Sequence, residues 1–249
     1  MRFFSKYNDN ERAFTMIEIA LSLAVVSFAL VAIIGVLPTG MTVQKDNRED
    51  VIINQEGRYW LEAIKGGGRG IGDLSKYVEE ISVTNAGVRL LNIVNTTSQP
   101  LTSSDIMALL STPKSAVATN SFTVARVKAM TGPAAEKGPL TNQSSFRYQI
   151  RAEVIPAFPV PPMYAGQREL DGDPSLRIYN ELVGNNLWEV RLVLRWPVVE
   201  RGNGWHVGNN RKTFRARIAG RTQPAGTNEV SSFLRNRQWM VVVPNQFNG

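Results

Sequence analysis

Residues 14–37 read FTMIEIALSLAVVSFALVAIIGVL and contain one charged side chain, Glu18. As an α-helix rising about 1.5 Å per residue, this stretch would span roughly 36 Å, whereas the hydrocarbon core of a bilayer is about 30 Å thick. It therefore predicts a membrane-spanning helix. A carboxylate inside hydrocarbon is costly, so an intramembrane Glu usually has a partner and a function. Glu18 is thus the first candidate functional residue.

The flanks of this stretch leave two ordinary alternatives to weigh. Residues 1–13 are polar and slightly basic, as a short cytoplasmic leader would be. A secretory signal peptide has an apolar core of about 7–15 residues and a small-residue cleavage site, whereas residues 14–37 are longer and run into Pro38. A plain signal anchor stays open, because basic residues before the span hold the N-terminus inside the cell.

The order of residues at the start of the stretch is more specific than its hydrophobicity. Ala13-Phe14-Thr15-Met16-Ile17-Glu18 places a small residue, an aromatic residue and a carboxylate before an unbroken apolar run. This order closely resembles the N-terminal cleavage and methylation motif of type IV pilins and type II secretion pseudopilins. In that family, a membrane prepilin peptidase cuts before the Phe and methylates the new amino group.

The resemblance implies cleavage between Ala13 and Phe14, N-methylation of Phe14, and an assembly segment that contains Thr15 and Glu18. Its expected partners are the prepilin peptidase, like or related pilin subunits, and the inner membrane. The expected location is the bacterial inner membrane, with the N-terminus cytoplasmic and the head periplasmic, and then a pseudopilus or surface fibre. The family normally has Gly before the cut, so Ala13 predicts slower processing.

A narrower resemblance covers residues 14–26, which are similar to pilin-like proteins of verrucomicrobial multi-gene cassettes, called Verru/Chthon cassette proteins. The long head and the absence of cysteine favour a minor pilin or pseudopilin over an abundant fibre subunit.

Packing identical helices side by side gives Glu18 a physical role. The N-terminal ammonium of a neighbouring subunit stays basic after methylation and can pair with this carboxylate in an apolar core. Such a pair would fix the axial register of the subunits. Loss of either partner would leave the other charge buried and unpaired, which should block assembly without preventing membrane insertion.

The chain after residue 37 predicts a second helical segment over residues 38–65. Pro38 removes a backbone hydrogen bond, so we expect a kink or a short melted stretch there. Val51, Ile52, Tyr59 and Ala63 fall roughly on one face and should pack on a sheet, with Glu56 and the other charged residues mostly elsewhere. The glycine run from Gly66 should end this helix and begin a head over residues 66–249.

The head contains several runs with the two-residue period of half-buried strands. Predicted strands lie at residues 146–154, 190–196, 214–218 and 238–243, and residues 81–94 predict a pair that turns at Asn85-Ala86-Gly87. These strands predict an antiparallel sheet, and the second half of the N-terminal helix should cover one of its faces. The predicted fold class is therefore α+β and pilin-like. Long surface loops are expected at residues 96–119, 156–163 and 169–174.

Composition limits the chemistry of the head. The chain has no cysteine and a single histidine, His206, which we expect in a surface loop, so thiolate and histidine metal clusters are excluded. Glu169, Asp171 and Asp173 could supply oxygen ligands for calcium, but Asp-Gly-Asp-Pro is primarily a turn sequence. The glycine run lacks the Gly-Lys-Ser/Thr ending of a phosphate loop. We therefore predict no cofactor, no metal and no enzymatic activity.

Charge is the remaining signal. The formal net charge is +7, and most of the excess lies between Arg147 and Arg237. Six arginines fall on the polar side of the predicted strands: Arg147, Arg151, Arg191, Arg195, Arg215 and Arg217. They could form a solvated face balanced by Glu153 and Glu189, or a face that binds an acidic protein, an anionic polysaccharide or DNA, since guanidinium binds carboxylate and phosphate at two points.

Two functions follow from the sequence. The first is a structural, pilin-like subunit that assembles through its N-terminal helix for secretion, adhesion or DNA uptake. The second is a membrane-anchored periplasmic binding module whose arginine face holds an anionic partner.

Overall fold

The computed structural model describes residues 14–67, 72–85, 87–98, 100–114, 121–130, 146–157, 183–202, 204–224 and 240–245. The chain divides into two compact units, Met1–Asp50 and Val51–Gly249. The leader residues 1–13, the expected loop at 169–174 and most of that at 156–163 lie outside the described residues, so the predictions for them remain predictions.

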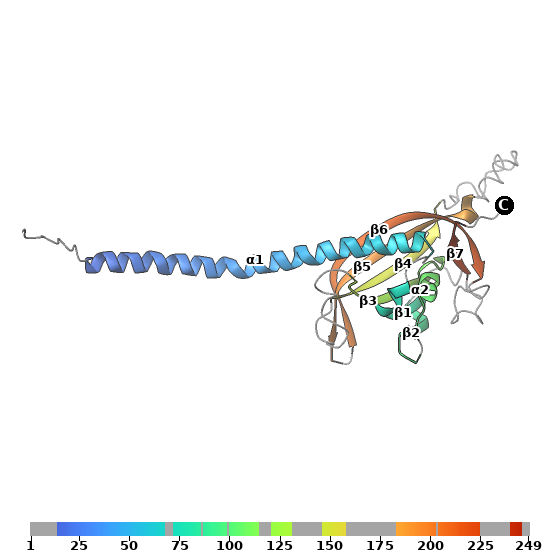
Figure 1. The fold of residues 1–249 in the computed structure, drawn as a ribbon, viewed down its shortest axis with the longest axis horizontal. Coiled ribbons are helices and arrows are strands. Elements are labelled where there is room, and N and C mark those ends of the chain that lie inside the picture. Colours follow the sequence, from blue (N-terminus) through green and yellow to red (C-terminus); the bar gives the residue numbers. More distant parts are fainter. Residues whose placement is uncertain are drawn as a thin grey trace, which may run out of the picture. The chain divides into compact units, whose positions relative to one another are not determined.

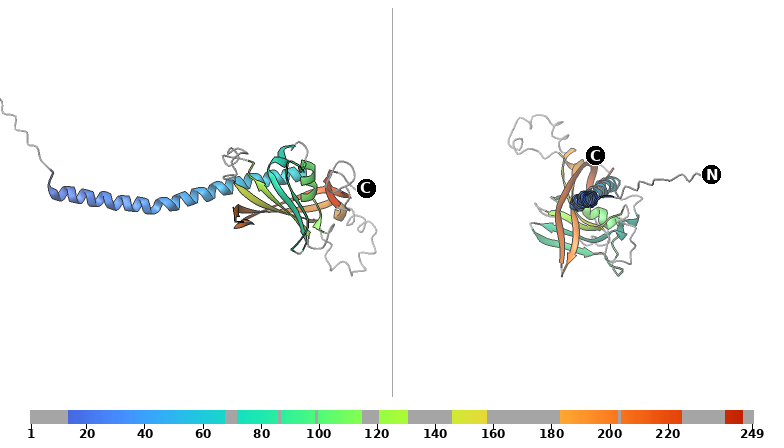
Figure 2. Two further views of the ribbon diagram at one scale, coloured as in Figure 1. Left: turned by 90° about the horizontal axis from the view of Figure 1, so that it is seen from below. Right: turned by 90° about the vertical axis from the view of Figure 1, so that its left-hand side faces the viewer.

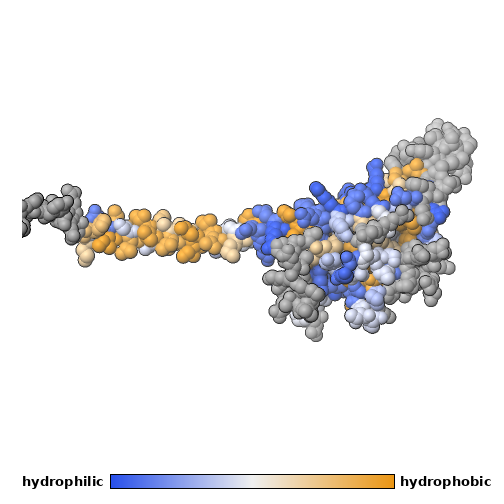
Figure 3. All heavy atoms as spheres, in the orientation of Figure 1, coloured by the Kyte–Doolittle hydropathy of each residue, from blue (hydrophilic) through white to orange (hydrophobic). Residues whose placement is uncertain are grey.

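The first unit consists of the N-terminal part of helix α1 (Met16–Lys65). Every residue from Phe14 to Leu37 is exposed, and hydrophobic side chains cover the visible side of this stretch (Figure 3). Its mean hydropathy reaches 2.8, so by length and composition it could cross a membrane. This much of the membrane prediction is supported.

The helix is unbroken at Pro38, so of the two alternatives expected there the melted stretch is wrong, and the kink stays a prediction. Residues Pro38, Thr39 and Gly40 are all helical, and the Thr42 hydroxyl donates to the Pro38 carbonyl oxygen at 3.0 Å. A proline deletes one hydrogen bond of the helix, and here the adjacent turns keep theirs.

Among the described residues, the second unit contains a seven-stranded antiparallel sheet, three main helical segments and a further helical turn at residues 183–186 (Figure 1). The strand order is β2-β1-β3-β4-β5-β6-β7. The strands are β1 (Val78–Asn85), β2 (Val88–Val94), β3 (Ser121–Lys128), β4 (Arg147–Pro156), β5 (Leu187–Arg201), β6 (Gly204–Pro224) and β7 (Met240–Pro244). The main helical segments are the end of α1, the 3-10 helix η1 (Gly72–Lys76) and helix α2 (Ser103–Leu110). The sheet is curled, and β5 and β6 form its longest hairpin (Figure 2).

The α+β class and the antiparallel sheet are confirmed, and all five strand predictions fall on observed strands. Tyr148, Ile150, Val190 and Leu192 are fully buried on the inner face, as the alternation predicted. Two strand segments were missed, namely β3 and the first half of β6. The second of these places His206 on an exposed strand position and not in the expected loop.

The buried face of α1 differs from the predicted one. Ile52 and Ala63 are buried as expected, but the exposed fractions of Val51 and Tyr59 are 55% and 42%. Glu56, expected away from the sheet, is fully buried. The observed stripe consists of Ile52, Ile53, Glu56, Gly57, Trp60, Leu61, Ala63 and Ile64. These residues are spaced by three or four positions, as expected for one face of a helix. This face was missed in the sequence because Glu56 is charged and was placed on the solvent side.

Glu56 anchors the end of α1 to the sheet through a buried hydrogen-bond chain. Trp60 Nε1 donates to Tyr148 Oη at 2.7 Å, and the Tyr148 hydroxyl donates to Glu56 Oε2 at 2.7 Å. Met130 N–H donates to Glu56 Oε1 at 2.7 Å. Indole N–H is only a donor, so the single proton of Tyr148 must point to Glu56. Burial and the nearby Glu56 carboxylate raise the pKa of Tyr148 well above its ordinary value, which keeps that proton in place.

Gly57 allows the same helix to approach β6 closely. A Cβ atom at this position would lie 2.3 Å from the Phe214 ring, which is a severe overlap. The absence of a side chain therefore permits the ring to lie against the helix backbone.

The end of α1 agrees with the glycine prediction. Gly66 N–H donates to the Glu62 carbonyl oxygen and Gly67 N–H to that of Ile64, and Gly67 has a φ of 65°. A left-handed residue directly after the last turn is the usual way for glycine to stop a helix.

Helix α2 corrects the loop expected at residues 96–119. Thr102 caps it, because Asp105 N–H donates to Thr102 Oγ1 at 3.1 Å and Thr102 N–H donates to Asp105 Oδ2 at 3.0 Å. Ile106, Leu109 and Leu110 are buried in the core. Helix α2 also bonds to the sheet, since the Thr123 hydroxyl donates to the Leu109 carbonyl oxygen at 2.7 Å. Thr102 is therefore a helix cap, whereas Thr96, Thr97 and Ser98 are exposed and outside the helix, as the loop prediction had it.

We predict that Tyr148→Phe destabilises the second unit. The substitution leaves the Trp60 N–H and one Glu56 oxygen without this partner in the core, which should lower the free energy of unfolding by about 1–3 kcal/mol. Urea unfolding of the full-length chain in detergent, followed by tryptophan fluorescence, measures the change. Tyr59→Phe removes a hydroxyl from the exposed side of the same helix and should leave the midpoint unchanged. Equal effects of the two variants would contradict the anchoring role of Tyr148.

Candidate functional site

The first candidate site is the beginning of α1. Thr15 N–H and Thr15 Oγ1 both donate to Glu18 Oε2 at 3.0 Å, and Glu18 N–H donates to Thr15 Oγ1 at 3.3 Å. This reciprocal pair is a capping box, which satisfies backbone donors at a helix N-terminus. Phe14 precedes it and is 80% exposed. Ala13 lies outside the described residues, so the structure does not place the cleavage position.

This geometry gives Glu18 a local role besides the one that the sequence suggested. In the isolated chain its carboxylate is held by its own helix, and negative charge there also suits the positive end of the helix dipole. The Thr15 contacts occupy one carboxylate oxygen, Oε2, and within the described residues no donor binds Oε1. A cation from another molecule could therefore reach Glu18 while the cap stays intact.

The second candidate site is the outer face of the sheet, opposite the face that buries Tyr148. The six predicted arginines lie on it, since each alternates with an inward residue of β4, β5 or β6. The register brings Arg191 directly opposite Arg215, and Gln149 directly opposite Arg195. The sequence therefore predicted their common face. Whether this face binds a partner stays a prediction.

Arg147 belongs to a carboxylate cluster at one side of this face. Glu79 Oε1 accepts from Arg147 Nε at 3.0 Å, and Glu79 Oε2 accepts from Arg126 Nε at 3.0 Å. Lys128 Nζ lies 3.2 Å from Glu79, and Arg126 Nη1 lies 2.7 Å from Glu80. The shift in register between Val78 and Glu80 in β1 places these two consecutive carboxylates near the same cations.

Trp205 covers the cluster. The Arg126 guanidinium carbon lies 4.1 Å from the centroid of the Trp205 ring, and that of Arg147 lies 5.3 Å from it. Trp205 comes from the β5–β6 hairpin, so the end of this hairpin contacts the outer face at β3 and β4. Sequence reasoning missed this cluster, because Glu79, Arg126 and Trp205 are far apart along the chain.

Two further arginines have acidic neighbours on their own strands. Arg151 Nη2 lies 2.7 Å from Glu153 Oε1, and Arg191 Nε lies 2.6 Å from Glu189 Oε1. The Arg151 guanidinium also lies over the Phe122 ring, 3.7 Å from its centroid. The balanced alternative, in which Glu153 and Glu189 neutralise the face, is therefore correct for these two residues.

A groove of about 720 Å³ opens on the same face beside the cluster. Its lining residues are Phe122, Val124, Gln149, Arg151, Glu153, Val193, Arg195, Asn209 and Arg211. Arg195 and Arg211 are directly opposite each other on β5 and β6, and Arg195 Nη2 donates to the Gly208 carbonyl oxygen at 3.3 Å. No described carboxylate forms an ion pair with either one. Arg211 was absent from the six predicted residues because the first half of β6 was not recognised as a strand.

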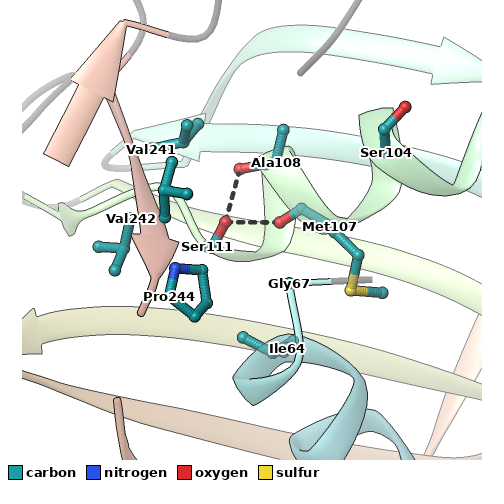
Figure 4. A pocket seen from close by; sticks show the side chains of 10 residues that line it. Ile64, Gly67, Ser104, Met107, Ala108, Ser111, Val241, Val242 and Pro244 are labelled. Atoms are coloured by element: carbon teal, nitrogen blue, oxygen red, sulfur yellow. Dashed lines mark hydrogen bonds between the residues drawn. The ribbon is translucent and has the colours of Figure 1, made fainter. Parts of the chain in front are cut away.

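A second, smaller recess of about 180 Å³ lies between the end of α1, α2 and β7 (Figure 4). Its wall is mainly apolar, with Ile64, Met107 and Val242 on three sides. Ser111 is its central polar side chain, and its hydroxyl donates to the carbonyl oxygens of Met107 at 2.6 Å and Ala108 at 3.3 Å. This serine is engaged with α2 and offers no free nucleophile.

The described residues contain no group of three or more His, Cys, Asp and Glu side chains that could hold a metal ion. Glu169, Asp171 and Asp173, the candidate calcium residues, are outside the part of the chain that the structure describes.

Comparisons with known proteins do not identify the chain. No family model matches it. No curated protein and no solved structure matches it either.

We predict that the Glu79 cluster makes the second unit sensitive to acid. Burial raises the pKa of Glu79, but Arg147, Arg126 and Lys128 outweigh it and hold this pKa below the ordinary value of 4.5. A carboxylate whose pKa is lower in the folded than in the unfolded protein stabilises the fold at pH values above its unfolded-state pKa. This stabilisation is lost as the pH falls through its folded-state pKa. The stability difference between wild type and Glu79→Gln should thus be full at neutral pH and shrink below about pH 4.5.

Urea unfolding at a series of pH values measures this difference. Glu62→Gln, which removes a carboxylate whose side chain is 71% exposed, should change stability little at neutral pH. A difference between wild type and Glu79→Gln that stays constant into acid would contradict the prediction.

Proposed function

We propose that the chain is a pilin-like subunit, processed by a prepilin peptidase and assembled through its N-terminal helix. The observation that carries the proposal is the position of Glu18 in the motif Phe14-Thr15-Met16-Ile17-Glu18, at the start of an exposed apolar helix. In this proposal Ala13 and Phe14 form the cleavage position, and Phe14 carries the methylated amine. The chain then passes from the bacterial inner membrane into a pseudopilus or surface fibre.

The surface of residues 14–37 supports an assembly role for the helix. Side chains on all sides of this segment are apolar and exposed, so it needs a lipid or protein environment. A plain anchor needs only the apolar surface. A carboxylate at the fifth position after Ala13, held so that one oxygen stays free, fits a subunit that must accept a neighbour's ammonium.

The second unit is consistent with a structural subunit. Among the described residues, two fully buried charged side chains, Glu56 and Asp105, hold α1 and α2 in place through hydrogen bonds to Met130 and Thr102. The proposed role of the unit is therefore structural.

A second candidate function is a membrane-anchored binding module. The groove with Arg195 and Arg211 favours it, since two neighbouring guanidinium groups would suit an anionic partner. In this case the N-terminal helix would serve only as an anchor.

Mass spectrometry of the purified protein separates the two candidates. If the chain is processed as proposed, its N-terminus is N-methylated Phe14. Ala13→Gly should increase the processed fraction, because it restores the usual residue before the cut, and Ala13→Leu should abolish processing. A chain that retains Met1 in cells with an active prepilin peptidase would exclude pilin-like processing.

Glu18→Gln tests the assembly role of the charge apart from its capping role. Gln can cap a helix as Glu does, so α1 and membrane insertion should persist, whereas the pair with a neighbour's ammonium is lost. Assembly, measured by cross-linking and by recovery of sheared fibres, should fall to the level of Glu18→Ala. Ser27→Ala, in the same apolar segment, should assemble normally. Normal assembly of Glu18→Gln together with failure of Glu18→Ala would assign Glu18 to capping alone.

A further inference from the structure

The groove on the outer face contains an unbalanced pair of like charges. Arg195 and Arg211 are direct cross-strand neighbours, and like charges in this position destabilise a sheet. Three other arginines of the face have carboxylate partners: Arg147 pairs with Glu79, Arg151 with Glu153 and Arg191 with Glu189. No described carboxylate forms an ion pair with Arg195 or Arg211, so ion pairs within the described residues do not balance this pair.

The surroundings of the pair favour an anion. Gln149 lies directly opposite Arg195, and Asn209 lines the groove near Arg211, so two side-chain amides can bond to a ligand in addition to the guanidinium groups. The side chain of Arg151 is held by Glu153 and Phe122 and marks the other side of the groove. A carboxylate between Arg195 and Arg211 would cancel their repulsion and form charge-assisted hydrogen bonds.

The rest of the lining distinguishes among anionic ligands. Val124, Val193 and Phe122 give the groove an aliphatic and aromatic component next to the arginines. Saccharides and single-stranded nucleic acids are usually held on free aromatic faces. Phe122 is the only aromatic side chain among the described lining residues, and the Arg151 guanidinium already lies on it. Aliphatic surface, amides and two cations together suit a peptide with alternating carboxylate and aliphatic side chains.

We propose that this groove binds an acidic peptide segment of a partner protein, with a carboxylate seated between Arg195 and Arg211. Aliphatic side chains of the segment contact Val124 and Val193, and its backbone amides bond to Gln149 and Asn209. The site belongs to the second unit, and its existence does not depend on processing or assembly at Phe14 and Glu18.

The test uses the full-length protein in detergent and a fluorescent peptide of alternating Glu and Val, with the matching Gln and Val peptide as the uncharged control. Fluorescence anisotropy at low salt should show binding of the first peptide only, weakening as salt rises. Arg195→Gln combined with Arg211→Gln should reduce affinity by about tenfold or more, since hydrogen bonds to charged groups are the strong ones. Glu153→Gln should tighten binding, because it removes a carboxylate that lines the groove.

The matched control is Arg215→Gln combined with Arg217→Gln, which removes the same charge from the same face outside the groove. It should change affinity less than the groove double variant does. Equal loss in both double variants would reduce the effect to general charge attraction and overturn the site. Absence of peptide binding at low salt would overturn it as well. Tighter binding of dextran sulfate or single-stranded DNA, with the same dependence on Arg195 and Arg211, would replace the peptide by another polyanion and overturn the assignment.

Discussion

The buried carboxylate of Glu56 is the constraint on which the packing of the second unit depends. One oxygen accepts the Met130 N–H beyond the end of β3, and the other accepts the Tyr148 hydroxyl of β4. These bonds fix the rotation of the helix, because Glu56 can reach both donors in only one orientation. Trp60 then fills the next turn and donates to the same tyrosine, and Gly57 lets Phe214 approach the helix. An isolated charge in the core would be unfavourable, and the two short hydrogen bonds offset that cost.

Helix α1 thus carries one carboxylate in the core of the second unit, Glu56, and one in an apolar segment, Glu18. Different contacts hold each of them. Glu56 is held by tertiary contacts that only the folded sheet supplies. Glu18 is held by Thr15, three residues away, so its hydrogen bonds exist in the isolated helix. A local cap needs neither a membrane nor a neighbouring chain, and in the proposed pilin-like function it would keep the carboxylate oriented before assembly. Capping and intersubunit pairing are therefore compatible roles for Glu18, since one of its oxygens serves the cap.

The sequence predicted those parts of the fold in which hydrophobic contrast follows the backbone period. β4 and β5 alternate Tyr148, Ile150, Val190 and Leu192 with charged residues, so both were evident. β3 was missed because its contrast is reversed at the start: Ser121 and Thr123 point into the core, whereas Phe122 and Val124 line the outer groove. Helix α2 was missed because its Ser and Thr residues suggested a loop. Its capping signature, Thr102 followed three residues later by Asp105, was nevertheless present in the sequence. Glu56 could not be assigned to the core from the pattern, since its partners come from distant strands.

The arginines illustrate the same limit at the level of the site. Alternation correctly placed six of them on one face, but it could not separate those that stabilise the fold from those that remain available. That separation depends on Glu79, which reaches Arg147 across the sheet, and on Trp205, which the β5–β6 hairpin brings over Arg126. Once these contacts are assigned, the charge of the face is no longer uniform. Ion pairs with Glu79 hold Arg147, Arg126 and Lys128, whereas no described carboxylate pairs with Arg195 or Arg211, where the groove also supplies apolar surface and amides. In the proposed peptide site, recognition would therefore depend on the shape of the groove more than on the net charge of the chain.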